Sequence, residues 1–429
     1  MKMKSLFLSL LCLSIIEAKP QVLTIDKMVE MTLTHSPDID IGRFDFKAAQ
    51  ERTKFAQGSY LPRLDVELSG GKQYSKMKNR SGGNIDVLSG GLGASQLLYD
   101  FGKTAGRVMG FTQESLALEA QMQQIISDKI FLVKQSYYGI LKTKSIIDVQ
   151  VKNVTLQKQQ LRRAQKYLEA GIKTIIDVSD AQVALEQAQL DLKNAQYDLE
   201  LKRAGLEEVL GYVPYEGNYV VYSKKLSMHK LSQTLPLVNV SLRHLELYAY
   251  KHRYVLSSSE YYVRGAQSNV DASKGEYYPT LSLDGHYQAQ HVDSAVLALT
   301  PERQGQISVN MSWNIFSGYQ TDASVQEAKI GVLKAASQVQ SVTLAIKRDV
   351  LESHIRLRQS KDNVLLSESI SKASLKKYDQ AEKRYANELS DYVELQDAQQ
   401  GYIESLSDLV KAYYDYFIAM AQLDHAIGK

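Results

Sequence analysis

Two pairs of acidic residues with the same spacing are the part of the sequence best placed to act on charged molecules. Asp177 and Asp180 lie in TIIDVSDAQ, and Glu394 and Asp397 lie in YVELQDAQ. Residues three positions apart share one face of a helix, so each pair can present two carboxylates together. Carboxylates that converge attract cations and raise one another's pKa. The alternative is that all four only favour the first turn of a helix, which contributes a few tenths to about 1 kcal/mol each.

No motif predicts catalysis, a cofactor or a metal site. FGKT at 101–104 ends like a phosphate-binding loop, but Leu97 stands where that loop needs a glycine. The eight histidines are scattered without the spacing of metal ligands, and no Gly-x-Ser-x-Gly nucleophile elbow occurs. The 51 Lys and Arg nearly balance the 48 Asp and Glu, which argues against a nucleic-acid binder. The sequence therefore predicts a protein that is not an enzyme.

The first residues predict export. Lys2 and Lys4 precede an apolar run at 6–16, and segment 1–18 has the form of a secretory signal peptide. The only cysteine, Cys12, lies inside this run and follows a leucine, where a lipoprotein cleavage site needs a small residue. Lipidation of Cys12 is therefore disfavoured, and the mature chain is expected to gain its stability without disulfides.

The rest of the chain reads as a tandem duplication. GSYLP at 58–62 recurs as GEYYP at 275–279, an offset of 217 residues. Asp-Ala-Gln at 180–182 recurs at 397–399 with the same offset. Repetition at one long period indicates two copies of one structural unit, so each half should contain the same elements in the same order.

Each half is predicted to contain three helices. The first has about 35 residues, at 24–58 and 241–275, with Thr24 as a cap in the first half. The second is very long, at 103–170 and 319–387, and on the order of 100 Å at 1.5 Å per residue. The third carries an apolar seam of knobs-into-holes type. The seam residues are Val178, Ala181, Leu185, Ala188, Leu192, Ala195 and Leu199 in the first half, and Leu395, Ala398, Tyr402, Ser405, Leu409, Ala412, Tyr416, Ala419 and Leu423 in the second.

Two strands of alternating polarity are predicted between the first and second helices of each half. In the first half, Leu64, Val66 and Leu68 alternate with polar residues, and 92–100 is the weaker partner. In the second half, the strands are expected at 281–288 and 307–316. Alternation with period two is typical of strands with one apolar face.

Four such strands cannot close into a barrel, and open edges are not tolerated in lipid. Three chains would supply twelve strands, which suits an outer-membrane barrel. The alternative is a small soluble β-subdomain on an exported coiled-coil spacer or adhesin.

Short motifs mark the element boundaries of both halves: GSYLP and GEYYP before the strands, LLYDFGK and WNIFSG after them, AGIKTIIDVSDAQ at a helical turn, and LGY and AIG at helix ends. In this order and repetition, they make the chain similar to the TolC-like outer-membrane channels of drug efflux and type I secretion. The resemblance extends over essentially the whole mature chain.

The resemblance implies a mainly α fold with a small β part. The expected assembly is a homotrimer whose twelve-stranded β-barrel in outer-membrane lipid continues into a periplasmic α-barrel of twelve helices. It implies a passive exit duct, without cofactors, that works with a periplasmic adaptor protein and an inner-membrane pump of the RND or ABC type. It does not choose among drugs, metals and proteins as cargo.

The resemblance also assigns a place to each segment of the chain. The expected order is a signal peptide (1–18), a periplasmic helix (19–58), an outer-membrane hairpin (59–101), a periplasmic helix pair (102–211), an inter-repeat linker (212–240), and then a second helix (241–275), hairpin (276–317) and helix pair (318–429).

The resemblance implies roles for the acidic pairs at the two helix–turn–helix tips, which converge at the periplasmic end of the duct. Glu394 and Asp397 match residues that ring the constriction. Asp177 and Asp180 match the first-repeat side of a latch, in which Tyr385 bonds Asp177 and holds the tip shut.

The tips also depart from the family. Ser390 stands where some members have an Arg that completes the latch, and Lys173 is a candidate substitute. Glu388 stands in the place of Gly171, and Asn387 is expected to take the left-handed conformation there. The predicted adaptor-contacting residues are Gly171, Ile172, Lys173 and Thr174 in the first tip and Asn387, Glu388, Leu389 and Ser390 in the second.

Overall fold

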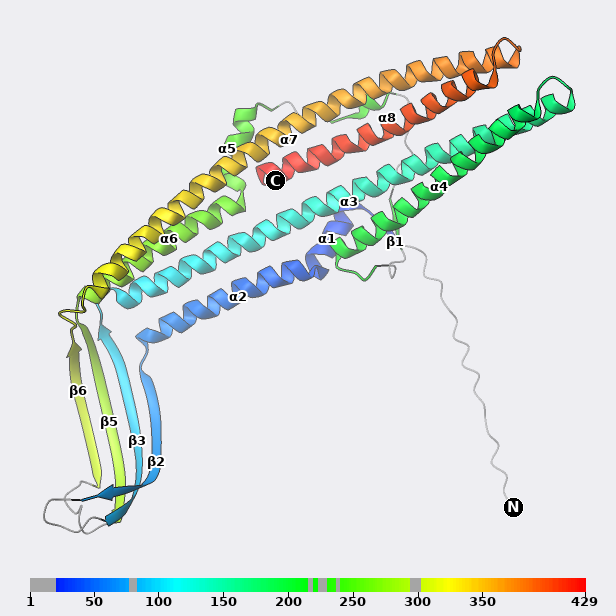
Figure 1. Cartoon of the computed structure of the whole chain (residues 1–429). Helices are drawn as coiled ribbons and strands as arrows, with labels where there is room; N and C mark the ends of the chain where they lie inside the picture. Colours follow the sequence, from blue (N-terminus) through cyan, green and yellow to red (C-terminus); the bar gives the residue numbers. More distant parts are fainter. Residues whose placement is uncertain (1–20, 77–82, 215–218, 223–229, 237–239, 294–301) are drawn as a thin grey trace, which may run out of the picture. The chain divides into compact units, whose positions relative to one another are not determined.

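A computed structural model describes residues 21–76, 83–214, 219–222, 230–236, 240–293 and 302–429 (Figure 1). The predicted signal peptide with Cys12, parts of both hairpin loops and parts of the linker at 212–240 lie outside the described residues. The chain divides into two compact units. Unit 1 comprises 1–37, 127–241 and 351–425, and unit 2 comprises 38–126, 242–350 and 426–429.

Unit 2 contains a four-stranded antiparallel sheet in the order β2–β3–β5–β6. The predicted hairpins β2–β3 and β5–β6 are confirmed, and β3 pairs with β5 to join the two repeats. The last strand was predicted at 307–316 and lies four residues earlier in the chain. The chain leaves the sheet after Ser312, and Trp313 Nε1 donates to the Tyr277 carbonyl oxygen at 3.0 Å. The strands are β2 Arg63–Ser75, β3 Gly83–Tyr99, β5 Thr280–Asp293 and β6 Arg303–Ser312.

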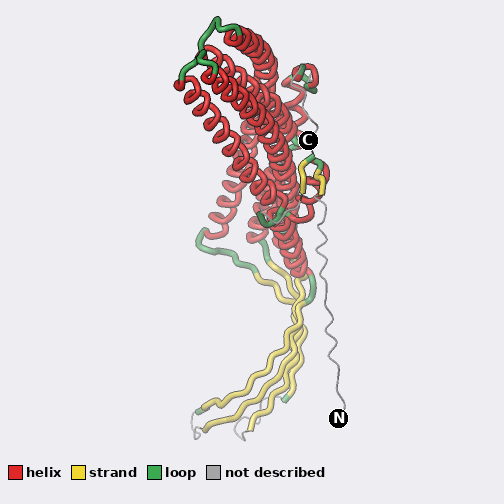
Figure 2. The backbone as a smooth tube through the Cα atoms, turned by 90° about the vertical axis from the view of Figure 1, so that its right-hand side faces the viewer, coloured by secondary structure: helices red, strands yellow, loops and turns green. Residues whose placement is uncertain are grey.

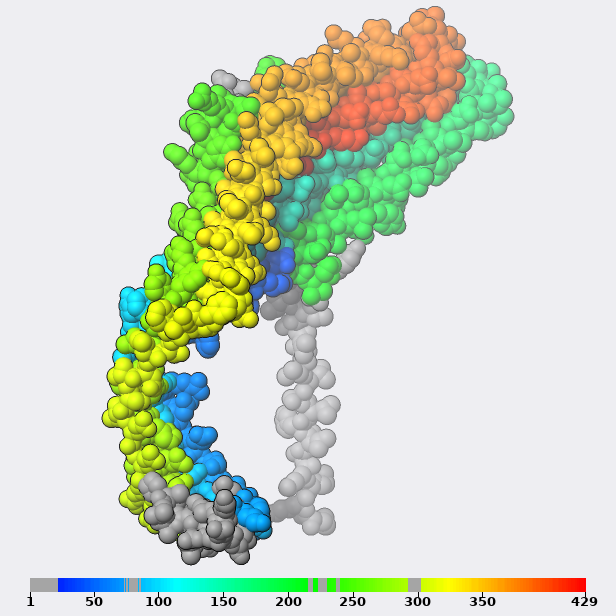
Figure 3. Space-filling view, turned by 60° about the vertical axis from the view of Figure 1, so that its left-hand side comes forward, coloured from blue at the N-terminus to red at the C-terminus, as the bar shows by residue number. Residues whose placement is uncertain are grey.

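The sheet has one apolar and one polar face. Cross-strand partners share a face, and the register pairs Val66 with Leu92 and Leu92 with Tyr287. The opposite face carries polar pairs such as Asp284 and Ser308. The apolar side chains are exposed, with Val66 72% exposed, and the strands of unit 2 extend away from the helices of the same unit (Figures 2 and 3). The predicted alternation is confirmed.

Two very long helices run through the chain as predicted. Helix α3 spans Lys103–Glu169 and helix α7 spans Gln320–Ala386, with 67 residues in each. Neither contains a proline that would interrupt its hydrogen-bond ladder. Each is therefore about 100 Å long at 1.5 Å per residue. Among the described residues, no helix combines the length and the apolar character needed to cross a membrane.

The first helix of each repeat is broken, where the sequence predicted one continuous helix. In repeat 1, α1 Ile25–His35 is followed by α2 Pro37–Gln57; Pro37 lacks an N–H and suits only the start of a helix. In repeat 2, α5 Leu242–His252 and α6 Tyr254–Lys274 show the same break without a proline. The predicted cap is confirmed, because Thr24 Oγ1 accepts from the Lys27 N–H at 3.4 Å.

Each break receives the end of another helix. A Cβ atom on Gly211 would lie 2.2 Å from the His35 carbonyl oxygen, and one on Gly428 would lie 2.7 Å from that of His252. Both glycines have positive φ. Only glycine combines this backbone conformation with so close an approach, which explains why Gly211 and Gly428 recur at the repeat offset.

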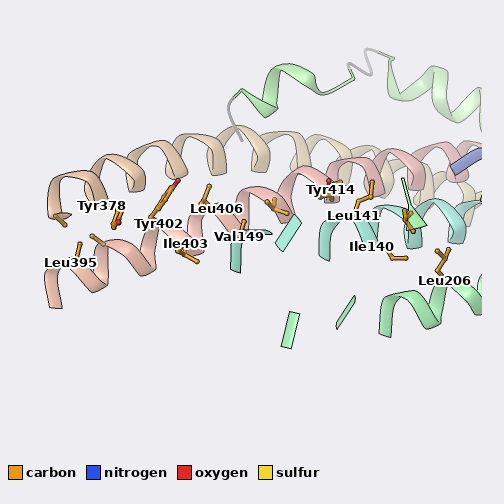
Figure 4. Close-up of a cluster of buried hydrophobic side chains, with 14 of the residues drawn as sticks. Ile140, Leu141, Val149, Leu206, Tyr378, Leu395, Tyr402, Ile403, Leu406 and Tyr414 are labelled. Atoms are coloured by element: carbon orange, nitrogen blue, oxygen red, sulfur yellow. The ribbon is translucent and has the colours of Figure 1, made fainter. Parts of the chain in front are cut away.

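The core of unit 1 lies between α3, α4 Ile175–Leu210, α7 and α8 Tyr392–Ile427. Both predicted seams are buried or half-buried, and the α8 seam is buried throughout. Figure 4 shows Tyr378, Leu395, Tyr402, Leu406 and Val149 gathered between these helices. Burial of one such side chain contributes about 1.5–3 kcal/mol. A short parallel pair, β1 Gln21–Leu23 with β4 Tyr219–Val221, was not predicted.

The linker between the repeats is anchored to α7. Its short 3-10 helix η2, Leu231–Thr234, donates the Ser232 N–H to Glu368 Oε2 at 3.0 Å, and Lys372 Nζ lies 2.5 Å from Glu368 Oε1. Burial raises the pKa of Glu368, but the bonds from Lys372 and Ser232 outweigh it and lower the pKa to about 2. The carboxylate therefore stays charged and holds the linker in place. Two further 3-10 turns, η1 Gly58–Tyr60 and η3 Gly275–Tyr277, lead into β2 and β5.

Candidate functional site

The two turns predicted as functional tips lie at the same end of unit 1 (Figures 1 and 2). In the first turn, the Gly171 N–H donates to the Leu168 carbonyl at 3.0 Å and the Ile172 N–H donates to the Tyr167 carbonyl at 2.8 Å. This is the Schellman arrangement, which requires a left-handed residue after the helix. Gly171 takes it, with φ +70°.

The second turn repeats this backbone residue for residue. The Glu388 N–H donates to the Tyr385 carbonyl at 3.2 Å, and the Leu389 N–H donates to the Arg384 carbonyl at 2.8 Å. Glu388 therefore takes the left-handed conformation, with φ +60°. The expectation that Asn387 would take it is wrong, because these two bonds fix the position of the strained residue. Asn387 instead donates its Nδ2 to the Lys383 carbonyl at 2.8 Å.

The helices after the two turns start in different ways. In α4, Asp177 Oδ2 accepts from the Thr174 N–H at 2.9 Å and from Thr174 Oγ1 at 2.8 Å. The backbone bond from Thr174, with smaller contributions from its hydroxyl and from Lys173, holds the pKa of Asp177 below its usual value. In α8, Asp391 stands at the place of Thr174 and accepts the Glu394 N–H at 2.9 Å. The Glu394 side chain is therefore not needed as a cap.

Glu394 pairs with an arginine that the sequence reasoning missed. Arg384 Nε lies 3.2 Å from Glu394 Oε1, and Arg384 Nη2 lies 3.4 Å from Glu394 Oε2. The same Nη2 donates to the Leu389 carbonyl at 3.3 Å. A forked contact of this kind fixes both partners. Asp397 is exposed and makes no ion pair or hydrogen bond with any residue that the structure describes.

Buried tyrosines lie behind the acidic residues. The Tyr385 ring lies 6.2 Å from the rings of both Tyr167 and Tyr392, and Lys173 Nζ lies 5.5 Å from its centroid. Burial, and then the negative charge of Asp177, raises the pKa of Tyr385. A cation over an aromatic face is attracted to it. Lys173 is thus joined to Tyr385, although no hydrogen bond joins Tyr385 to Asp177 among the described residues.

The negative charge of Asp180 affects Tyr392 as that of Asp177 affects Tyr385. Burial raises the pKa of Tyr392 to about 12, and the charges of Tyr385 and Asp180 add to this effect. The Tyr392 hydroxyl is buried and has no hydrogen-bond partner among the residues that the structure describes. The same is true of the hydroxyl oxygen of Ser390, the residue predicted to replace a latch Arg. The charges of both first-repeat acids thus add to the raised pKa values of buried tyrosines in the second repeat.

Further from the turns, a second ion pair links the two long helices of unit 1. Arg163 Nη2 of α3 lies 3.5 Å from Glu382 Oε1 of α7. Among the described residues, no cluster of three or more His, Cys, Asp or Glu side chains is arranged to hold a metal ion. The chemistry of this site is therefore that of fixed charges, hydrogen bonds and buried hydroxyls.

The model of the outer membrane efflux protein family matches residues 28–212 and 249–429. These two matches fall on the two repeats and together cover most of the chain. The chain belongs to the outer membrane efflux protein family, whose members are channel proteins and not enzymes.

Individual relatives agree with this assignment. The outer membrane protein TolC of Vibrio cholerae is 22% identical over 386 residues, covering 89% of this chain and 85% of that protein. The protein CyaE of Bordetella pertussis is 23% identical over 341 residues, covering 78% and 69%. A crystal structure of CusC, described as a transmembrane channel, has a TM-score of 0.82 at 16% identity, covering 94% and 92%. The mainly helical fold with a small sheet is thus that of TolC-like channels.

Proposed function

We propose that three copies of this chain form a passive outer-membrane channel for efflux or type I secretion. The observation that carries this proposal is the amphipathic four-stranded sheet, whose outer strands β2 and β6 have no further partner among the described strands. A sheet edge in lipid must be paired. If β6 of one copy pairs with β2 of the next, three copies close a barrel of twelve strands. The apolar face then meets lipid, and the polar face lines the lumen.

The helical segments then extend into the periplasm, where an adaptor engages the tips and an inner-membrane pump of the RND or ABC type supplies energy. Each tip displays an apolar side chain at equivalent positions: Ile172 is 48% exposed and Leu389 is 69% exposed. Ile176 and Val393 extend these patches. Exposed apolar patches of this kind are typical of protein-interaction sites.

We propose that the tips form the gate. Asp397 supplies the unpaired carboxylate of the constriction. Glu394 adds a second carboxylate when the bond between Glu394 and Arg384 opens. Asp177 and Asp180 hold the tip closed by facing the buried tyrosines. Lys173, over the Tyr385 ring, takes over part of the role of the Arg that Ser390 replaces. Rings of carboxylates favour cations in a pore.

The channel and its gate are tested by single-channel recording in planar bilayers. We expect the wild-type protein to run as a heat-labile trimer and to show a low, cation-favouring conductance. The double variant Glu394→Ala/Asp397→Ala should conduct more and lose the cation preference. A monomer without conductance would overturn the channel. Unchanged selectivity in the double variant would remove the constriction from these residues.

The adaptor surface needs a separate test. The variant Ile172→Asp/Leu389→Asp places a charge on each apolar patch, so it should abolish export in cells while the purified trimer keeps its conductance. Loss of both conductance and export would indicate a folding defect. Normal export in the variant would contradict adaptor docking at these two residues.

A further inference from the structure

Unit 2 contains a cavity that the proposed channel and gate do not use. It has a volume of about 560 Å³ and lies between α2, α3 and α6. Aromatic side chains form its walls, namely Phe55, Phe111 and Tyr262. Gly110 and Gly265 also line it. A cavity of this size and lining falls in the range of sites for small organic molecules.

The sequence creates this cavity through two glycines on α3. A Cβ atom on Gly106 would lie 2.6 Å from the Ala272 backbone nitrogen, and one on Gly110 would lie 2.8 Å from Asn269 Oδ1. Helices α3 and α6 therefore pack almost backbone to backbone. Large side chains on either side of such a contact border a hollow that is open to solvent, with Phe55 83% exposed and Arg107 also exposed.

The polar lining of the cavity carries an unbalanced positive charge. Arg107 lines it and makes no ion pair or hydrogen bond with any described residue. Glu114 also lines it, but Arg52 Nη1 lies 2.8 Å from Glu114 Oε1 and balances that carboxylate. Tyr262 is held in place, because its hydroxyl accepts from Gln121 Nε2 at 3.3 Å. One guanidinium with all its donors available thus stands beside aromatic walls.

We propose that this cavity binds an amphiphilic organic anion. The Arg107 guanidinium receives the sulfonate, phosphate or carboxylate head through paired hydrogen bonds. The apolar body lies against Phe55, Phe111 and Tyr262, which offer large contact areas. The ligand is either a membrane phospholipid or a soluble amphiphile, since both present this chemistry.

The position of the cavity suits either source. Phe55 lies a few residues before β2, and Arg107 lies in the second turn of α3, which begins soon after β3 ends. The cavity is thus next to the helical end of the sheet. All its lining residues belong to unit 2 of one chain, so the proposal stands independently of the trimer and of the gate.

The probe is 1-anilinonaphthalene-8-sulfonate, which has an aromatic body and one sulfonate. The fluorescence of the probe is titrated against the full-length protein in a non-ionic amphipol, without detergent. We expect saturable binding that Arg107→Ala weakens about tenfold or more, the size of a lost charge-assisted hydrogen bond. Ala266→Leu places a larger apolar side chain in the cavity without changing any charge and should weaken the same binding component.

Arg264→Ala is the matched control. Arg264 lies on α6, as Ala266 does, and it does not line the cavity. Its guanidinium lies over the Tyr261 ring, 5.3 Å from the centroid. Its loss should leave the affinity unchanged. Dodecyl sulfate should displace the probe at lower concentration than dodecyl maltoside, because the two share a chain and differ in head charge.

The source of the ligand is decided by native mass spectrometry of protein extracted from membranes. Phospholipid retained by the wild type and lost in both Arg107→Ala and Ala266→Leu identifies a membrane lipid. Absence of retained lipid, with probe binding that dodecyl sulfate competes, identifies a soluble amphiphile. The proposal is overturned if the wild type shows no saturable binding. It is also overturned if Arg107→Ala and Ala266→Leu bind the probe with the same affinity as Arg264→Ala. A second copy of the chain that occupies the cavity would give this result.

Discussion

The two tips share one backbone and differ in what holds them. In the first tip, Gly171 takes the left-handed position without strain, and Asp177 bonds within its own helix to Thr174. In the second tip, Glu388 takes the same position with a side chain, and Glu394 reaches across to Arg384 on the other helix. The duplication has kept the turn and changed its side-chain bonds. The first tip is stabilised locally, whereas the second depends on a contact between helices that can open.

The largest expected difference between the two tips is in the free energy of unfolding lost when a buried side chain next to each tip is removed. Leu395 is fully buried, and its first-repeat counterpart Val178 is only half-buried. Leu395→Ala should therefore lower the free energy of unfolding by about 2–5 kcal/mol, and Val178→Ala by about 1 kcal/mol or less. Denaturant unfolding of the two purified variants measures both values. Equal losses would contradict the idea that the second helix pair is packed more tightly here.

The next effect concerns the left-handed residue. Glu388→Gly should raise the free energy of unfolding by about 1 kcal/mol, because a side chain in this conformation costs roughly 1–2 kcal/mol. Gly171→Ala should lower it by a similar amount. A Cβ on Gly171 would meet no atom within 4 Å, so this variant reports backbone strain alone. The two denaturant midpoints should move in opposite directions.

Removal of the Arg384–Glu394 ion pair should have a smaller effect on stability and a clear effect on ion selectivity. Both partners are substantially exposed, so Arg384→Ala should change the free energy of unfolding by only about 0.2–1 kcal/mol. It should nevertheless strengthen the cation preference in bilayers, since Glu394 loses its counter-charge. Adding Glu394→Ala should cancel the gain. Lys383→Ala, which removes a neighbouring charge outside the pair, serves as the control.

The smallest effect concerns how the stability of the first tip depends on acidic pH through the Asp177 carboxylate. Because Thr174 holds the pKa of Asp177 below its usual 3.8, the carboxylate stabilises the tip above that value and the stability is lost as pH falls through the lowered pKa. Thr174→Val removes the hydroxyl donor, so the pKa of Asp177 in the folded protein moves back toward 3.8 and the loss of stability on acidification should become smaller. Thermal unfolding between about pH 6 and pH 3 measures it. Ser179→Ala, which alters a hydroxyl outside this bond, should match the wild type.

The repeat, the long helices, the hairpins and the buried seams were all predictable, because they rest on periodicity and on a constant offset. The break after His35 was signalled by Pro37, but the matching break after His252 was not, since it arises where Gly428 approaches that carbonyl. The Asp391 cap could have been found by carrying Thr174 across the offset of the repeat.

The pairing of Arg384 with Glu394 could not be predicted from the sequence. The two residues belong to different helices, and their contact depends on the geometry of the turn between them. Lys173 was a candidate latch residue in the sequence, but its position over the Tyr385 ring, which joins the two repeats, is set by the same packing. Local patterns predict where charges lie along a helix, but the partner of each charge is set by tertiary packing.

The two unpaired edges of the sheet also have a consequence for biogenesis. A newly exported chain presents hydrogen-bonding edges and an apolar face at once, and such a species is prone to self-association. Its folding yield should therefore depend on chain concentration and on how soon lipid is available. If three copies close the barrel as proposed, maturation and assembly become a single kinetic event, and holding chaperones would determine how many chains complete it.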